Sequence, residues 1–220
     1  MNWDERFAGE EYLFGTAPAR FLEKQVHRLP PGSEVLVVAD GEGRNSVWLA
    51  ELGHTVNAWD SSAVAIKKAR RVARTRDVDV TFSIQNAAEY PWPKARFDAV
   101  IGIFIQFAPP KLRDEILAGM MRAARPGGLV MLHGYTVEQL KYGTGGPSVA
   151  ENLYTEAFLR NRFAGTDIVY IESYEENLSE GTAHVGRSAL IDLVARVRVQ
   201  GEETQPYEPR RAVALPTSAV

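Results

Sequence analysis

Two glycines and an acidic residue occur at the spacing of a nucleotide-binding site. Gly41 and Gly43 follow the apolar run 35–39, and Asp60 follows the next apolar run, 55–59. Glycines let the backbone pass close to a ligand, and a helix N-terminus offers free N–H groups to a carboxylate or phosphate. An acidic residue about 20 positions further on commonly accepts hydrogen bonds from both ribose hydroxyls. The pattern indicates an adenosine-containing cofactor, although a tight turn and a helix cap alone would use the same residue types.

The turn departs from the fingerprint of dinucleotide-binding proteins. That fingerprint requires a third glycine where this sequence has Ser46, and Glu42 would repel a pyrophosphate. A second nucleotide-binding half would also need more room than 220 residues with an antiparallel edge provide. An NAD(P)-dependent oxidoreductase is therefore the alternative rather than the first interpretation.

Short apolar runs alternate with helical segments through the first 133 residues. Strands are predicted at 35–39, 55–59, 78–84, 97–103 and 129–133, and helices at 17–29, 44–52, 61–76 and 110–124. Apolar runs bounded by glycine are typical of strands buried on both faces of a parallel sheet. Such strand–helix repeats give right-handed crossovers and a doubly wound sheet.

The pattern changes after residue 134. A short helix is predicted at 155–163, and two strands at 167–174 and 188–199 have no helix between them, so they should pair antiparallel. We therefore predict a single-domain α/β fold. Its Rossmann-like sheet has seven strands, mostly parallel with an antiparallel edge pair, and helices on both faces. The domain should span 1–200, with an N-terminal helical segment, 1–30, over the cofactor site and a mobile tail at 201–220.

The composition argues against several other classes of protein. Hydrophobic residues make up 45% and charged residues 24%, the net charge is −3, and Lys and Arg are scattered, so we expect neither a nucleic-acid nor a membrane partner. The absence of cysteine removes thiolate metal sites and Cys nucleophiles, and no metal is expected. The charged N-terminus lacks the apolar stretch of a signal peptide. We expect a cytoplasmic monomer or homodimer that acts on a small molecule.

Several segments in order resemble one enzyme family. They are V-L-V-V-A-D-G-E-G-R-N at 35–45, G-H-T-V-N-A-W-D-S-S at 53–62, F-D-A-V-I at 97–101, R-P-G-G-L at 125–129 and W-D-E-R-F at 3–7. Together they resemble class I S-adenosylmethionine-dependent methyltransferases over residues 2–198, in the tellurite-resistance and thiopurine methyltransferase-like branch. The resemblance implies S-adenosyl-L-methionine as cofactor and a small acceptor, such as a thiol or a chalcogen oxyanion.

The resemblance also implies which residues contact the cofactor. They are Trp3, Arg6, Tyr12, Ala39, Asp40, Gly41, Gly43, Arg44, Asp60, Ser61, Asn86, Ala87 and Ile103. The sequence departs from the family where Val37 and Ala39 replace an Asp and a Gly, and where Asn86 replaces an Asp that accepts from adenine. Asp40 or backbone carbonyls could replace the missing carboxylate, and an amide oxygen can still accept. These departures leave open a protein that binds the cofactor without catalysis.

The residues that could act on the acceptor lie outside the strand–helix core. His184 and Arg187, expected in the loop between the last two strands, offer a titratable group and a fixed cation. His133 ends the fifth strand, and Tyr135 and Tyr142 flank the glycine-rich loop 143–147. Aromatic residues that could surround the sulfonium through cation–π contacts are Trp3, Tyr12, Phe14, Phe104 and Phe107. No single residue is identified as the catalytic base.

Overall fold

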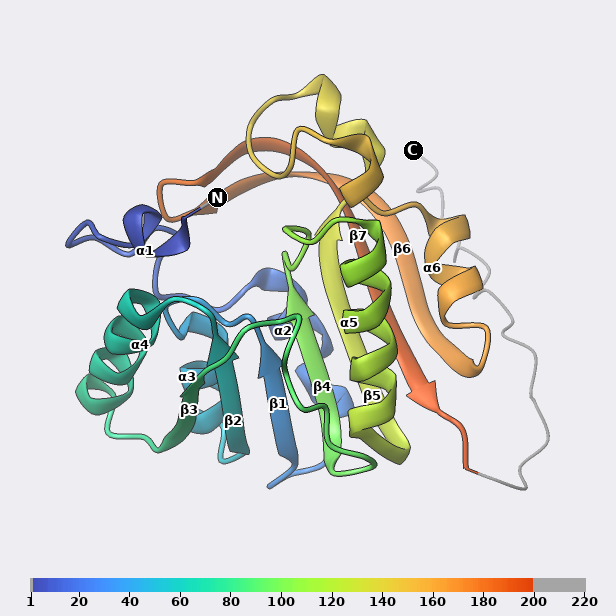
Figure 1. Ribbon diagram of the computed structural model, residues 1–220, viewed down its shortest axis with the longest axis horizontal. Coiled ribbons are helices and arrows are strands. Elements are labelled where there is room, and N and C mark those ends of the chain that lie inside the picture. The colour runs from blue at the N-terminus through green and yellow to red at the C-terminus, as the bar shows by residue number, and fades with distance from the viewer. Residues whose placement is uncertain (1, 200–220) are drawn as a thin grey trace, which may run out of the picture.

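The computed structural model describes residues 2–199, which form one mixed sheet with helices on both faces (Figure 1). The strands are β1 Glu34–Val38, β2 Thr55–Asp60, β3 Val80–Ile84, β4 Phe97–Ile103, β5 Ala124–Tyr135, β6 Thr166–Glu180 and β7 His184–Val197. They pair in the order β3-β2-β1-β4-β5-β7-β6, with β7 antiparallel to both of its neighbours. The predicted fold class, with its antiparallel edge pair, is confirmed.

The helices begin and end close to the predicted positions. They are α1 Trp3–Arg6, α2 Arg20–Gln25, α3 Arg44–Glu51, α4 Ala63–Thr75, α5 Pro110–Ala123 and α6 Glu156–Arg162, with short 3-10 helices at Val26–Arg28, Val137–Lys141 and Ala150–Asn152. Side-chain hydrogen bonds cap the N-termini of two of these helices. The Ser62 hydroxyl accepts from the amide of Ala65 at the start of α4, and Thr155 does the same for Phe158 at the start of α6. The N-terminal segment is less helical than predicted, because the helix expected at 17–29 is confined to α2 and one 3-10 turn.

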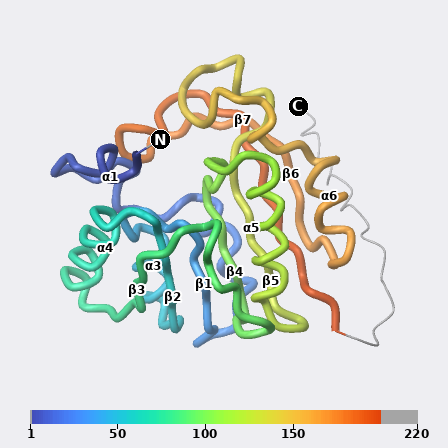
Figure 2. The backbone as a smooth tube through the Cα atoms, viewed as in Figure 1, coloured from blue at the N-terminus to red at the C-terminus, as the bar shows by residue number. Residues whose placement is uncertain are grey.

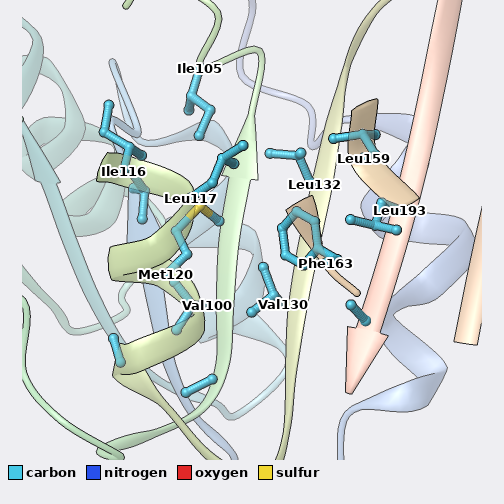
Figure 3. Packing of buried hydrophobic residues seen from close by; sticks show 14 of the residues in the cluster. Val100, Ile105, Ile116, Leu117, Met120, Val130, Leu132, Leu159, Phe163 and Leu193 are labelled. Atoms are coloured by element: carbon cyan, nitrogen blue, oxygen red, sulfur yellow. The ribbon is translucent and has the colours of Figure 1, made fainter. Parts of the chain in front are cut away.

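Alternate residues of the central strands point to two separate cores. Val35 and Val37 of β1 face α2, α3 and α4, whereas Leu36 and Val38 face the other side. On that second side, residues of α5 and α6 pack against β4, β5 and β7 (Figure 3). The central strands are therefore buried on both faces, as their continuous apolar runs predict.

The last two strands are much longer than the sequence predicted. Their pairing continues from Thr166↔Val197 to Glu180↔His184, so only residues 181–183 remain as the connecting turn. The far ends of β6 and β7 arch over the sheet toward α1 (Figures 1 and 2). His184 and Arg187 thus lie in a strand, not in the loop where they were expected. The tail predicted at 201–220 lies outside the described residues.

Candidate cofactor and acceptor site

The turn after β1 is built from residues with left-handed backbone conformations. Ala39 has φ +48°, Gly41 +64° and Gly43 +88°. Ala39 takes this conformation without being a glycine, which costs roughly 1–2 kcal/mol. Gly43 has a packing role as well, since a Cβ there would lie 2.7 Å from the Ala69 Cβ of α4. The turn therefore needs glycine for its own geometry, whatever it binds.

The turn is tied to the end of the neighbouring strand β2. The Gly41 amide donates to Asp60 Oδ2 at 2.9 Å, and the Ser62 amide donates to Asp60 Oδ1 at 2.8 Å. Burial raises the pKa of Asp60, and these backbone hydrogen bonds oppose that rise. Because an ionised carboxylate has about four lone-pair sites, Asp60 can still accept from two further hydroxyls. The predicted Gly41–Asp60 constellation is thus assembled in the structure.

Two buried charged residues flank the turn. Asp40 is hydrogen-bonded to the Ser46 hydroxyl through Oδ2, whereas its Oδ1 has no hydrogen-bond partner among residues 2–199. Burial raises the pKa of Asp40 to about 7; the nearby Asp60 charge adds to this rise and the Ser46 hydrogen bond opposes it. Arg44, the first residue of α3, lies 2.9 Å from Glu180 Oε2 at the end of β6. An unsatisfied carboxylate oxygen and a cation therefore meet beside the glycine turn.

Residues 7–15, here called the N-terminal cover, lie over this turn. The Phe7 side chain is only 2% exposed and would lie 3.5 Å from a Cβ at Gly41. The Leu13 amide donates to Glu42 Oε2 at 2.7 Å, and the Leu13 carbonyl accepts from the Thr182 amide at 2.9 Å. Glu42 also forms a buried ion pair of 2.7 Å with Lys68 of α4. The cover is thus anchored both to the glycine turn and to the tip of the β6–β7 hairpin.

Aromatic rings continue from the cover into the end of the sheet. Trp3 stacks on Phe7 with ring centroids 5.5 Å apart, Phe7 meets Phe14 at 6.1 Å, and Phe14 meets His184 at 4.4 Å. Phe104, at the end of β4, lies 4.2 Å from His184. These rings, with those of Phe21, His133 and Tyr135, form what we call the aromatic cluster.

Two buried histidines of the aromatic cluster are each held by a carboxylate. His133 Nδ1 lies 2.6 Å from Asp192 Oδ1, and His184 Nδ1 lies 3.4 Å from Glu180 Oε2. Burial lowers the pKa of His184, and the adjacent Glu180 opposes that effect. Burial alone would raise the pKa of Glu180, but its hydrogen bond to His184 and the charge of Arg44 bring it down to about 2.

Other residues predicted for the acceptor site lie elsewhere. Arg187 is exposed and pairs with Glu175, and the Tyr142 hydroxyl donates to the same carboxylate at 2.6 Å. These three residues form a surface network between the hairpin and the end of the 3-10 helix Val137–Lys141. Of the predicted aromatic residues, Phe107 is 37% exposed. Tyr12 lies against α4, where its hydroxyl accepts from Arg71 Nε at 3.1 Å.

The remaining residues predicted to bind the cofactor occupy varied positions. Asn86 is exposed, and its side-chain oxygen accepts from the Ala88 amide at 3.0 Å, as in a local turn. Ala87 and Ile103 are buried, Ser61 is exposed, and the Arg6 guanidinium lies 4.9 Å from the Trp3 ring centroid. Their contacts with a cofactor stay predictions.

Sequence reasoning missed the partners that hold these side chains. Phe7, Glu180 and Asp192 each contact a predicted site residue from a distant part of the chain. The apolar alternation at 188–199 could have indicated Asp192, because a carboxylate at a buried strand position needs a partner. Nothing local indicates Glu180, whose neighbours 175–180 read as a polar loop.

The sequence and the fold resemble those of known methyltransferases. Residues 35–128 match the family profile described as "Methyltransferase domain". Over 96 residues the chain is 31% identical to the 2-heptyl-1-hydroxyquinolin-4(1H)-one methyltransferase of Mycobacteroides abscessus, covering 43% of this chain and 42% of the relative. The chain spans about half the length of the first curated relatives it matches.

Solved structures resemble the chain over most of its length. A protein studied for the conversion of a disulfide bond into a thioacetal group during echinomycin biosynthesis has a TM-score of 0.72 at 21% identity, with 89% of this chain and 88% of that chain covered. TehB from Haemophilus influenzae has a TM-score of 0.69 at 15% identity, with 90% and 68% covered. At these identities the likeness shows the fold alone, which is Rossmann-like.

Residues 35–128 thus resemble a methyltransferase domain, and S-adenosyl-L-methionine is the cofactor that this resemblance implies. The site fits that group. The unpartnered Asp40 Oδ1 suits an ammonium, Arg44 suits a carboxylate and Asp60 suits two ribose hydroxyls.

Two other features are absent from residues 2–199. No group of three or more His, Asp or Glu side chains there is arranged to hold a metal ion. No helix in the same range is long and apolar enough to cross a membrane.

Proposed function

We propose that the chain is an S-adenosylmethionine-dependent methyltransferase that acts on a small-molecule acceptor. The observation that carries the proposal is the turn at 39–43. It is tied by its own amide to Asp60 and flanked by Asp40, whose buried Oδ1 has no hydrogen-bond partner among the described residues. A buried carboxylate oxygen without a donor is unfavourable, so its retention supports a ligand that supplies the donor.

Different residues of the chain would bind different parts of the cofactor. Asp60 would accept from the ribose hydroxyls, Asp40 would bind the ammonium of the methionine moiety, and Arg44 would bind its carboxylate. Phe14 and Phe104 would stabilise the sulfonium through cation–π contacts, worth about 0.5–2 kcal/mol each. Asn86 can bind the adenine amino group through a second lone pair of its side-chain oxygen.

The bound cofactor supplies an electrophilic methyl group, and the protein has to align an acceptor with it and exclude water. Alignment of donor and acceptor can lower the barrier by several kcal/mol. The N-terminal cover and the hairpin tip meet at the end of the sheet through the Leu13–Thr182 hydrogen bond. A site covered in this way and lined by aromatic rings would suit a small acceptor better than a macromolecule. The net charge of −3 also argues against nucleic acid.

The acceptor can be narrowed to two kinds. The resemblance to the tellurite-resistance and thiopurine branch favours a thiol or a chalcogen oxyanion, which needs no base when it is already ionised. The Mycobacteroides relative is named for a hydroxylated quinolone, which favours a heteroaromatic hydroxyl. The two kinds place different demands on the site, because only the second must lose a proton.

Side-by-side calorimetry tests the cofactor. S-adenosylmethionine and S-adenosylhomocysteine should bind the full chain at micromolar concentration or below, whereas NAD and NADP should not. Methyl transfer is then assayed with 1-hydroxyquinolin-4(1H)-one, thiophenol and selenite. Tight binding of NAD or NADP alone would favour the oxidoreductase alternative. Binding of S-adenosylhomocysteine without turnover of any acceptor would favour a non-catalytic binding protein.

A further inference from the structure

The His133–Asp192 pair joins two antiparallel strands at a buried position. The two residues are directly opposite each other in the β5–β7 register, and they are only 2% and 1% exposed. The Tyr174 hydroxyl on β6 donates to the same Asp192 oxygen at 3.3 Å. The carboxylate therefore contacts His133 at Nδ1, so the other ring nitrogen, Nε2, remains available for a different hydrogen-bond partner.

A role limited to joining the strands does not explain this pair. Replacing a buried ion pair by apolar residues of similar volume is often neutral or stabilising. Asp192 Oδ2 is buried and has no hydrogen-bond partner among residues 2–199, and the hydrogen bond of the His133 ring to Asp192 is made through Nδ1, not Nε2. A carboxylate that accepts from Nδ1–H fixes the tautomer in which Nε2 is a proton acceptor. The arrangement is that of an oriented base.

The end of β4 presents an aromatic ring to this base. Phe104 has φ +54°, which is unusual for a residue other than glycine, and its ring centroid lies 4.5 Å from that of His133. Non-glycine residues keep such conformations where their surroundings hold them, and they concentrate at functional sites. Phe104 also contacts His184, with ring centroids 4.2 Å apart, and the Glu180 carboxylate that holds His184 also pairs with Arg44 beside the glycine turn. His133 is thus connected through Phe104 and His184 to the residues beside the glycine turn.

We propose that His133 is the general base for methyl transfer to an aromatic hydroxyl and that Asp192 is its positioning residue. This inference rests on the proposed function and deepens it. His133 Nε2 takes the hydroxyl proton, the freed oxygen lone pair forms the bond to the methyl carbon, and the electron pair of the broken carbon–sulfur bond stays on sulfur. The resulting imidazolium is stabilised by Asp192. A thiolate or an oxyanion would not require such a base, so the pair points to an acceptor that keeps its proton in neutral solution.

A chromophoric phenol tests the proton transfer directly. Para-nitrophenol absorbs at longer wavelength when ionised, so difference spectra report its state on the full-length protein saturated with S-adenosylhomocysteine. The buffer is set below the pH at which the free probe ionises. The titratable groups around His133 are Asp192 and His184 of β7 and Tyr174 and Glu180 of β6. A fixed buffer pH keeps the bulk conditions the same for every variant.

We expect wild-type protein to bind the probe with its ionised fraction increased at least about tenfold over that of the free probe. His133→Gln should bind it mostly protonated, whereas His184→Gln should keep it ionised. With S-adenosylmethionine, His133→Gln should lower the rate of para-nitrophenol methylation by about 100-fold or more. The loss with para-nitrothiophenol, which is already ionised, should be much smaller, because that acceptor needs no base.

Asp192 variants separate positioning from a purely structural role. Asp192→Asn should bind the probe protonated, because an amide can stabilise the wrong tautomer of His133, and Asp192→Glu should restore part of the ionisation. A structural role would lower the melting temperature and leave the ionised fraction unchanged.

Several results would overturn the inference. They are a probe that stays protonated on wild-type protein, a probe that shows no saturable binding, and a His133→Gln variant that ionises it as wild type does. The first of these is measured on wild-type protein, so it does not depend on whether a variant folds. Failure of S-adenosylhomocysteine to bind would remove the proposed function and this inference together. Its binding with an unaffected probe would remove the inference alone.

Discussion

The amide of Gly41 donates a 2.9 Å hydrogen bond to the carboxylate of Asp60, so the turn after β1 and the end of β2 hold each other in place. The same carboxylate accepts from the Ser62 amide at the start of α4. Asp60 therefore organises the backbone around the proposed cofactor site in addition to offering its remaining lone pairs to a ribose.

Replacement of Asp60 should weaken cofactor binding. Asp60→Ala removes charge-assisted hydrogen bonds worth about 1.5–3 kcal/mol, which corresponds to a roughly 10- to 100-fold loss of affinity for S-adenosylhomocysteine in calorimetry. Asp98→Ala is the matched control, because Asp98 lies near the opposite end of the sheet, where it pairs with Arg125. Unchanged affinity in Asp60→Ala would exclude the ribose assignment.

The two glycines of the turn should respond differently to alanine. At Gly43 a Cβ would lie 2.7 Å from Ala69, so Gly43→Ala should lower the free energy of unfolding by about 2–4 kcal/mol through overpacking and backbone strain. At Gly41 the nearest neighbour is the Phe7 ring at 3.5 Å, an ordinary contact. Gly41→Ala should therefore lose only about 1–2 kcal/mol of stability, while S-adenosylhomocysteine affinity falls by about tenfold or more. Urea titration and calorimetry on both variants distinguish the effects, and normal binding by Gly41→Ala would make that glycine purely structural.

Ala39→Gly should stabilise the protein despite the flexibility of glycine. Ala39 is held at φ +48°, and glycine relieves a strain of roughly 1–2 kcal/mol while losing about 0.5–1 kcal/mol through chain entropy. The net gain in the free energy of unfolding should be about 0.5–1 kcal/mol in urea titrations. Ala50→Gly, in the regular backbone of α3, is the control and should be destabilising. A destabilised Ala39→Gly would show that the alanine methyl makes contacts that outweigh the strain.

Strand positions were predictable because burial on both faces produces uninterrupted apolar runs, as in β4, whose observed bounds Phe97–Ile103 equal the predicted ones. The length of the β6–β7 hairpin could not be predicted from the sequence. Its outer half is mostly polar and partly exposed, and its pairing depends on the register set where β7 joins β5. The sequence likewise indicated Gly41, Asp60 and His133 as candidate site residues. It did not indicate that they contact Phe7, Glu180 and Asp192. Those contacts join distant segments whose meeting is decided by topology.

The stability of the protein should depend on pH through Asp40. Its pKa in the folded protein is raised to about 7 from the ordinary value of 3.8, chiefly by burial. A raised carboxyl pKa means that the folded state resists ionisation, so the destabilising contribution is absent below pH 3.8, grows up to about pH 7 and is then constant. The free energy of unfolding of Asp40→Asn, relative to wild type, should therefore rise across this window by up to about 1.4 kcal/mol per pH unit.

Urea titrations at several pH values measure this difference for Asp40. Asp98→Asn, which changes a partly exposed and paired carboxylate, is the control and should show a much smaller slope. If Asp40 binds the ammonium of the cofactor, Asp40→Asn should also lose affinity for S-adenosylhomocysteine. Its affinity for methylthioadenosine, which lacks the amino acid moiety, should be unchanged. Equal losses for both ligands would contradict that assignment.

The structure separates His184 from Arg187, which the sequence grouped as one acceptor-binding pair. His184 is buried between Phe14 and Phe104 and bound to Glu180, whereas the Arg187 side chain is 59% exposed and bound to Glu175. His184→Gln should lower kcat/KM by about tenfold or more, because the hairpin tip loses its contact with the aromatic cluster; this corresponds to about 1.4 kcal/mol of transition-state stabilisation. Arg187→Ala should change kcat/KM by less than about twofold and stability by less than about 1 kcal/mol, as expected for an exposed ion pair. Steady-state kinetics on the first acceptor that gives turnover, with a melting curve for each variant, measures both effects. A tenfold loss in Arg187→Ala with an anionic acceptor, at an unchanged melting temperature, would return Arg187 to the active site.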